Sequence, residues 1–214
     1  MTREFTGLDP ARMRENLDRI RERIAQAGRD PSEVEICAAT KYVPAGELPA
    51  LADAGVTLVG ENRAQELLQK QEEHGDLFEW DFIGALQSRK VRDVAPAVRL
   101  IHSVASDSAL AQLEKQPARE VLVQVNVASE EGKTGIAPGE LAEFIERSPV
   151  IVGGLMTMPP FTEWAEDSRR HFARLAELAA EHGLARLSMG TTQDYEVAVQ
   201  EGATIVRLGS VLYS

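Results

Sequence analysis

Lys41 has the side chain with the clearest chemical potential in this sequence. It follows a short apolar run that ends at Ala39, and a loop containing Pro44 comes after it. A lysine at the end of a buried strand can have its ammonium desolvated, which lowers its pKa and frees the amine to act as a nucleophile. Most lysines are solvated, so this segment alone favours an ordinary surface lysine. Other parts of the chain must decide between the two roles.

Two segments near the end of the chain have the composition of an anion site. Gly190-Thr191-Thr192 precedes a predicted helix, and Gly209-Ser210 follows the last apolar run. Backbone N–H groups and hydroxyls at the start of a helix can bind a phosphate group. Simple capping of the helix by Thr191 or Thr192 explains the first segment as well. The two roles are compatible because they use the same donors.

A nucleophilic amine close to a phosphate site would suit a phosphorylated aldehyde held as a Schiff base. Pyridoxal 5'-phosphate (PLP) fits that description, and its pyridine nitrogen would then need a partner. Arg207 is the candidate for that partner. Val206 and Leu208 flank it, so in a strand its side chain points to the opposite face from theirs. A salt bridge or a surface position is the alternative role for Arg207.

Predicted helices and strands alternate along the sequence. Apolar residues at helical spacing predict the helices, and short runs of β-branched or other apolar residues predict the strands. The long helix predicted near the end of the chain places Trp164, Phe172, Leu175 and Leu178 near one face. Helices are predicted over residues 10–27, 47–54, 62–73, 88–94, 107–115, 138–146, 163–182 and 194–201, and strands over 34–39, 56–59, 80–83, 100–104, 121–127, 151–158, 184–189 and 205–208.

Repeated strand–helix units predict an α/β fold with a parallel sheet and helices outside it. Eight units after one extra helix predict a closed (β/α)₈ TIM barrel, with an open doubly wound sheet as the competing architecture. No G-x-G-x-x-G motif follows a predicted strand, so we favour the barrel. We expect one domain over residues 1–214, with a helix in residues 1–30 packed on the barrel. The last strand would close against the first, which would bring Lys41 near the phosphate segments.

Composition argues against several classes of function. The 214 residues carry a net charge of −11, which is unsuited to nucleic acid or to an anionic membrane surface. The amino terminus lacks the apolar stretch of a secretion signal, so we expect a cytoplasmic protein. Cys37 is the single cysteine and is expected in the core. The four histidines are scattered, so we expect no metal site and assign His102 to a structural or barrel-mouth position.

The motifs along the chain, taken in order, resemble one known family. They are Ala39-Thr40-Lys41, Gly60-Glu61-Asn62, Phe82-Ile83-Gly84-Ala85-Leu86-Gln87, Gln124-Val125-Asn126, Lys133-Thr134-Gly135, Gly154-Leu155-Met156, Ser188-Met189-Gly190 and Val206-Arg207-Leu208-Gly209. Each motif is weak by itself, but the ordered set spans nearly the whole chain after the first helix. The chain resembles the pyridoxal phosphate homeostasis proteins, which are single-domain relatives of the amino-terminal barrel of alanine racemase.

The resemblance implies the same fold and a PLP site built from several strand ends. It implies that Lys41 forms the internal aldimine with the cofactor and that Arg207 faces the pyridine nitrogen. It also implies that Asn62 lies beside the cofactor. The phosphate would be held by Gly190, Thr192, Gly209 and Ser210.

Some positions depart from the family pattern. Asp81 stands where a histidine is common, and Arg89 replaces a usual asparagine. Thr191-Thr192 stands in place of Met-Ser, although Thr192 keeps the hydroxyl that could bind phosphate. The chain ends at Ser214, where the family usually continues with glycine. We expect the contacts around the third strand to differ because of Asp81 and Arg89.

An arginine beside the pyridine nitrogen bears on whether the protein is an enzyme. Arginine only donates hydrogen bonds, so the nitrogen stays unprotonated and the ring is a weaker electron sink than with a carboxylate partner. The resembling racemases take a second base from a β-rich domain of a partner subunit, and this sequence shows no such domain. We therefore expect no catalytic residue, and a monomeric carrier that buffers PLP or delivers it through transient contact with apo-enzymes.

Two catalytic functions are the alternatives. A PLP-dependent amino-acid racemase or decarboxylase would use the same lysine, and a Schiff-base aldolase would act on a phosphorylated sugar without a cofactor. An absorbance band near ~420 nm that depends on Lys41 would exclude the cofactor-free aldolase. Turnover of amino acids would favour the racemase or decarboxylase over the carrier.

Overall fold

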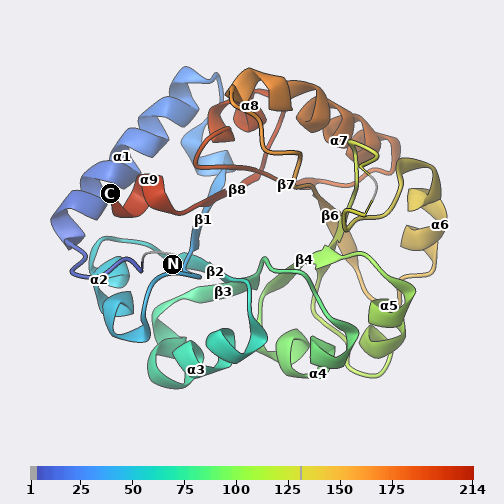
Figure 1. Ribbon diagram of the computed structural model, residues 1–214, viewed down its shortest axis with the longest axis horizontal. Coiled ribbons are helices and arrows are strands. Elements are labelled where there is room, and N and C mark those ends of the chain that lie inside the picture. The colour runs from blue at the N-terminus through green and yellow to red at the C-terminus, as the bar shows by residue number, and fades with distance from the viewer. Residues whose placement is uncertain (1–3, 131) are drawn as a thin grey trace.

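Parallel strands form a closed ring at the centre of the molecule (Figure 1). The computed structural model describes residues 4–130 and 132–214. The strands are β1 (Glu35–Ala39), β2 (Leu58–Glu61), β3 (Glu79–Phe82), β4 (Leu100–Val104), β5 (Val121–Gln124), β6 (Val152–Met156), β7 (Arg186–Thr191) and β8 (Ile205–Leu208). Each strand pairs with the next along the chain, and β8 pairs with β1 to close the ring. The predicted TIM barrel is confirmed, and the open doubly wound sheet is excluded.

Helices cover the outside of the barrel. In the described part of the chain, no helix is both long and apolar enough to cross a bilayer. The helices are α1 (Pro10–Gln26), α2 (Leu48–Asp53), α3 (Ala64–His74), α4 (Val91–Val94), α5 (Asp107–Leu113), α6 (Leu141–Glu146), α7 (Arg169–Glu181), α8 (Tyr195–Gln200) and α9 (Ser210–Tyr213).

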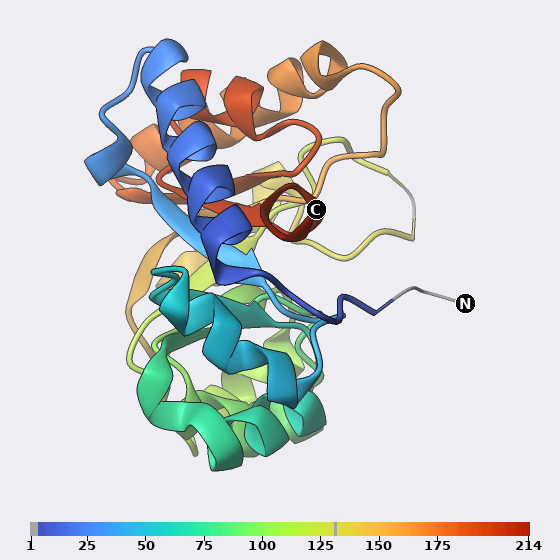
Figure 2. The same ribbon diagram turned by 90° about the vertical axis from the view of Figure 1, so that its left-hand side faces the viewer.

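The extra helix α1 precedes the barrel and packs on it. It begins where the Ala11 N–H donates to Asp9 Oδ1 at 2.9 Å, with Pro10 at its first position. Figure 2 shows α1 along the outside of the barrel, beside α9. The Asn16 side chain joins the two helices because its Nδ2 donates to Leu212 O at 2.9 Å. The apolar face of α1 is buried through Met13, Leu17, Ile20 and Ile24.

Alternation along the strands separates two apolar layers. The larger layer lies between the strands and the helices, and it includes Val206 and Leu208 from β8. Arg207 lies between these two residues and points into the barrel, as the alternation predicted. Cys37 is fully buried, which confirms its expected place in the core. The smaller layer inside the barrel contains Cys37, Leu58, Leu100, Leu122, Met156 and Ile205.

The prediction of one long helix from residue 163 is wrong at its start. Helix α7 begins at Arg169, and residues Ala165–Ser168 form a 3₁₀ turn before it. Trp164 therefore lies outside the helix, and 69% of its surface is exposed. A 3₁₀ turn has three residues per turn, which breaks the α-helical spacing that had placed Trp164 on the apolar face.

No helix was predicted after the last strand, whereas a short helix follows it. Helix α9 has only four residues, too few to give a periodic signal. Two of its residues, Leu212 and Tyr213, are nevertheless buried. The Tyr213 hydroxyl donates to Ala39 O at 3.2 Å, so α9 packs against the end of β1.

Candidate functional site

Closure of the barrel brings the ends of β1 and β8 to one edge. Cys37 pairs with Arg207 and Ala38 pairs with Leu208 in parallel register. The residues that follow these strands, including Lys41 and Gly209, therefore lie at the same end of the barrel. This is the C-terminal face, where TIM barrels carry their functional groups.

Arg207 is the most constrained of the predicted site residues. Only 5% of its surface is exposed. Its NH1 donates to Ser188 Oγ, and its NH2 donates to Thr157 O at 3.0 Å and to Met158 Sδ at 2.8 Å, so all three partners are neutral. Burial lowers the pKa of Arg207 to about 10, which leaves the guanidinium cationic at neutral pH. Neither alternative role, at the surface or in a salt bridge, is observed among the described residues.

The two glycine-containing segments meet beside the end of β8. The Gly209 N–H donates to Thr192 Oγ1 at 3.3 Å, which joins the loop after β7 to the loop after β8. Ser210 is exposed at the first position of α9. We call Gly190, Thr192, Gly209 and Ser210, which the resemblance predicts to hold phosphate, the phosphate corner.

Gly190 has a packing role that the sequence did not reveal. Its φ of +89° favours glycine, and a Cβ atom there would lie 2.6 Å from Ala198 Cβ. The absence of a side chain thus lets the end of β7 approach α8 closely. The proposed capping of α8 by a threonine is wrong, because the Thr191 N–H and hydroxyl both donate to Asp194 Oδ1, at 2.8 and 3.1 Å.

Lys41 is exposed at the rim of the barrel. Its Nζ lies 4.9 Å from the centre of the Tyr42 ring, and the side chain lines a cavity of about 460 Å³ that Asn62 also lines. The desolvation expected for its ammonium is therefore not observed. The reason is local, because Thr40 O accepts the Val43 N–H at 2.8 Å, and this turn carries Lys41 out of the strand direction.

A buried ion pair that the sequence did not predict supports this turn. Lys70 on α3 donates to Glu61 Oε1 and, at 2.9 Å, to Thr40 O. The Thr40 hydroxyl also donates to Glu61 Oε1 at 2.7 Å. Lys70 resembled a surface lysine because Gln69 and Gln71 flank it and two glutamates follow in α3. The carboxylate of the Gly60-Glu61-Asn62 motif, at the end of a buried strand, was the available signal that a cation lies nearby.

Asn62 lies at the end of β2 and has an unpaired side-chain oxygen. Its Oδ1 is buried without a hydrogen-bond partner among the described residues. Leaving a buried acceptor unpaired costs about 1–3 kcal/mol. The geometry therefore suits a ligand that brings a hydrogen-bond donor to this oxygen. Asn62 also lines a second cavity of about 800 Å³.

The departures around the third strand have different outcomes. Arg89 is exposed, lines the second cavity and donates from Nε to Gln87 Oε1 at 3.1 Å. Asp81 instead lies inside the barrel, where His102 and Arg99 both bind its carboxylate. Burial raises the pKa of Asp81, but hydrogen bonds from His102 and Arg99 outweigh it and hold the pKa below its ordinary value.

Two positions were predicted for His102, a structural one and one at the barrel mouth. The structure places it inside the barrel, in the structural position. It is fully buried and contacts Ser188 and Asp81. Burial lowers its pKa, and the cations Arg207 and Arg99 add to this effect against the opposing effect of Asp81. Within residues 4–130 and 132–214, no group of three or more His, Cys, Asp or Glu side chains is arranged to hold a metal ion.

Known proteins match this chain over nearly its full length. The alanine racemase N-terminal domain family matches residues 8–214. A pyridoxal phosphate homeostasis protein of Aquifex aeolicus is 40% identical over 213 residues, which cover 92% of this chain and 93% of the relative. A protein of the same name from Pseudomonas aeruginosa is 42% identical over 209 residues, with 91% and 90% covered.

A solved structure also matches this chain over nearly its full length. PipY from Synechococcus elongatus, solved with PLP bound, is 31% identical to this chain, with a TM-score of 0.79. The match covers 94% of this chain and 100% of that one. Sequence and fold agree over the whole barrel, including the strand ends that carry the candidate site. The chain therefore belongs to the pyridoxal phosphate homeostasis protein family, which shares the fold of the alanine racemase N-terminal domain.

Proposed function

We propose that this protein binds PLP as a Schiff base on Lys41 and serves PLP homeostasis without turning over a substrate. The observation that carries this proposal is Arg207, a buried cation with neutral partners beside the phosphate corner. Relatives named pyridoxal phosphate homeostasis protein support the role, and PipY, solved with PLP bound, supports the cofactor.

Each side chain of the site has a distinct task in this proposal. The Lys41 amine binds the aldehyde of the cofactor after its side chain rotates away from Tyr42 toward the barrel mouth. This rotation moves an exposed, unbranched side chain and requires no change in the barrel. The phosphate corner supplies amide and hydroxyl donors. Asn62 offers its unpaired Oδ1 to a donor of the cofactor.

Arg207 accounts for binding without turnover. When bound, PLP supplies an electrophilic aldehyde and a ring that can accept electrons. The guanidinium of Arg207 donates to the ring nitrogen and cannot accept from it, so the nitrogen stays unprotonated. The ring is then a weak electron sink, which favours holding the cofactor over carbanion chemistry. A racemase tolerates such a ring, but the relatives named pyridoxal phosphate homeostasis protein favour the carrier over the racemase or decarboxylase.

We further propose that the protein is a cytoplasmic monomer that contacts apo-enzymes transiently when it delivers PLP. A net charge of −11 supports solubility and disfavours self-association. Lys41 and the phosphate corner lie at an open end of the barrel, where a second protein could reach the cofactor.

Absorbance of the purified protein with added PLP tests the proposed function. The wild-type protein should show a band near ~420 nm. Lys41→Ala should abolish the band, whereas Lys115→Ala, which removes an exposed lysine after α5, should retain it. A wild-type protein without the band would overturn the proposal. Steady consumption of amino acids by the loaded protein would replace the carrier with an enzyme.

A further inference from the structure

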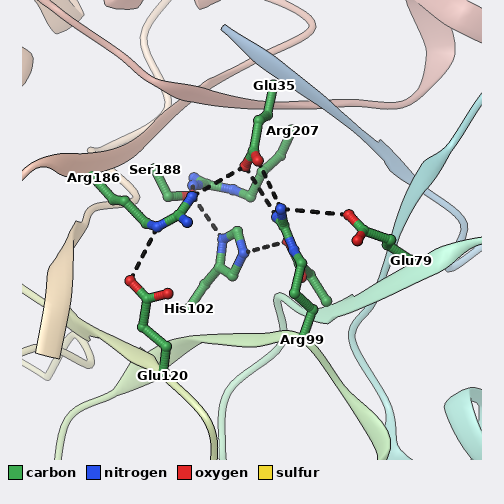
Figure 3. Close-up of polar contacts among 9 residues, drawn as sticks. Glu35, Glu79, Arg99, His102, Glu120, Arg186, Ser188 and Arg207 are labelled. Carbon is green, nitrogen blue, oxygen red and sulfur yellow. Dashed lines mark hydrogen bonds and ion pairs between the residues drawn. The ribbon is translucent and has the colours of Figure 1, made fainter. Parts of the chain in front are cut away.

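A chain of polar side chains crosses the barrel interior from Arg207 toward the opposite face (Figure 3). Arg207 NH1 donates to Ser188 Oγ, and this oxygen lies 2.8 Å from His102 Nδ1. His102 Nε2 lies 3.0 Å from Asp81 Oδ2. The four residues come from β8, β7, β4 and β3, and all are buried.

An ion pair continues the chain to the N-terminal face. Arg99 donates from Nε to Asp81 Oδ1 at 3.0 Å and from NH2 to Asp81 Oδ2 at 2.8 Å. The same guanidinium binds both oxygens of Glu35, at 2.6 and 3.0 Å. Glu35 is the first residue of β1, so the network starts at one end of the barrel and reaches Arg207 near the other.

When His102 is neutral, the chemistry of the end groups fixes the direction of every hydrogen bond in the chain. Arginine only donates, so Ser188 Oγ accepts from Arg207. The Asp81 carboxylate is ionised and only accepts, so His102 Nε2 carries a hydrogen and donates to it. In the neutral ring, Nδ1 is then the acceptor, and the Ser188 hydroxyl donates to it. One tautomer of His102 thus satisfies all the links.

This arrangement holds Arg207 without cancelling its charge. Ser188 Oγ and Thr157 O bind two different nitrogens of the guanidinium, and both are neutral acceptors. A carboxylate in direct contact would compete with the ring nitrogen of PLP for the same donors. Asp81 acts instead through His102 and Ser188, where it orders the chain but stays away from Arg207.

We propose that Ser188, His102 and Asp81 are positioning residues that fix the orientation of Arg207 from inside the barrel and so strengthen the binding of PLP. This inference rests on the proposed function, because Arg207 contacts the cofactor only if PLP binds here. A network with a purely structural role would change stability alone. The test therefore needs readouts of the His102 tautomer and of cofactor affinity.

The first readout uses the protein without added cofactor. Nitrogen NMR of protein labelled at histidine should show His102 neutral, with its hydrogen on Nε2, at neutral pH. Asp81→Asn should move the hydrogen toward Nδ1, because the neutral amide removes the negative charge that favours a hydrogen on Nε2. A wild-type His102 that is cationic, or that carries its hydrogen on Nδ1, would overturn the proposal without the need for a variant.

The second readout is the PLP dissociation constant, measured from the absorbance band. Ser188→Ala and Asp81→Asn should each raise it about tenfold, the effect of losing a hydrogen bond to a charged group. Glu120→Gln is the matched control, because it removes an ion pair with Arg186 at the same face that reaches the chain only through Glu35, and it should stay within about twofold of wild type.

The two proposals fail in different ways. A wild-type protein that binds no PLP would defeat the proposed function, whatever the tautomer of His102. A folded Ser188→Ala protein with wild-type PLP affinity would defeat the positioning role and leave the proposed function intact. Circular dichroism on each variant confirms that the fold is retained, and the tautomer measurement still decides if a variant does not fold.

Discussion

His102 Nε2 lies 3.0 Å from Asp81 Oδ2 at the centre of the barrel, and neither side chain is exposed. The pair joins β4 to β3 out of reach of solvent. Burial favours a neutral imidazole between the carboxylate and the serine hydroxyl. The protonation of His102 is therefore linked to the stability of the barrel and not only to the proposed site.

This linkage predicts a pH dependence of stability. The pKa of folded His102 is held below its ordinary value of 6.5. The unfolded state then binds more protons as the pH falls below that value, so the contribution of His102 is complete above the unfolded pKa and is lost as the pH falls through the folded pKa. We expect the free energy of unfolding, measured with urea, to decrease with falling pH in that range. His102→Gln should reduce this slope, and an unchanged slope in a folded variant would contradict the prediction.

The buried pair of Lys70 and Glu61 predicts a large effect on stability. Lys70→Met should lower the free energy of unfolding by about 3–5 kcal/mol, because it leaves the Glu61 carboxylate buried without its cation. Denaturant titration measures this change. The exposed Lys115→Met control should stay within about 0.5 kcal/mol. If both variants were equally stable, the ion pair would be solvated in solution and would not support the Lys41 turn.

Alanine substitutions at two glycines distinguish the cost of backbone strain from the cost of steric overlap. Gly190 and Gly202 have φ values of +89° and +97°, so alanine at either position costs about 1–2 kcal/mol from the backbone alone. A Cβ at Gly202 would meet Leu187 Cδ1 at an ordinary 3.7 Å, whereas at Gly190 it would overlap Ala198. Gly190→Ala should therefore be more destabilising, by about 1–3 kcal/mol. Equal thermal shifts in the two variants would show that overlap with α8 contributes nothing.

We expect the Asn62→Ala substitution to affect protein stability and PLP binding in different ways. Asn62→Ala removes a buried oxygen that has no partner in the described ranges, so stability should be unchanged or higher by up to about 1 kcal/mol. The same variant should weaken PLP binding about tenfold, because the donor of the cofactor loses its acceptor. Thermal unfolding and absorbance titration measure the two effects.

Asn126→Ala provides the comparison for Asn62. The Asn126 side chain is paired at both ends, since its Nδ2 donates to Glu130 O at 2.9 Å and its Oδ1 accepts from the Glu130 N–H at 3.2 Å. This variant should lose about 1 kcal/mol of stability. A comparable loss in Asn62→Ala would show that Asn62 has a structural partner and is not reserved for a ligand.

The sequence alone was sufficient to predict the barrel and the face of β8 to which the Arg207 side chain points. Both depend on short-range patterns, because alternation within β8 needs only Val206 and Leu208, and repeated strand–helix units pack in the same way. The ordered motifs were sufficient for the family. Local patterns failed where the helical period changed, as at Trp164, and where an element was too short to show a period, as in α9.

Only the tertiary structure decided which inward-facing residues meet. Asp81 is 21 positions from His102, and His102 is 86 positions from Ser188, yet they form one chain of hydrogen bonds. Alternation shows that such residues face inward, but it does not give their height along the barrel axis. That height is set by the tilt and register of all the strands together, which closure of the whole barrel determines. The partners of Arg207 are therefore a property of the closed barrel and not of any one segment.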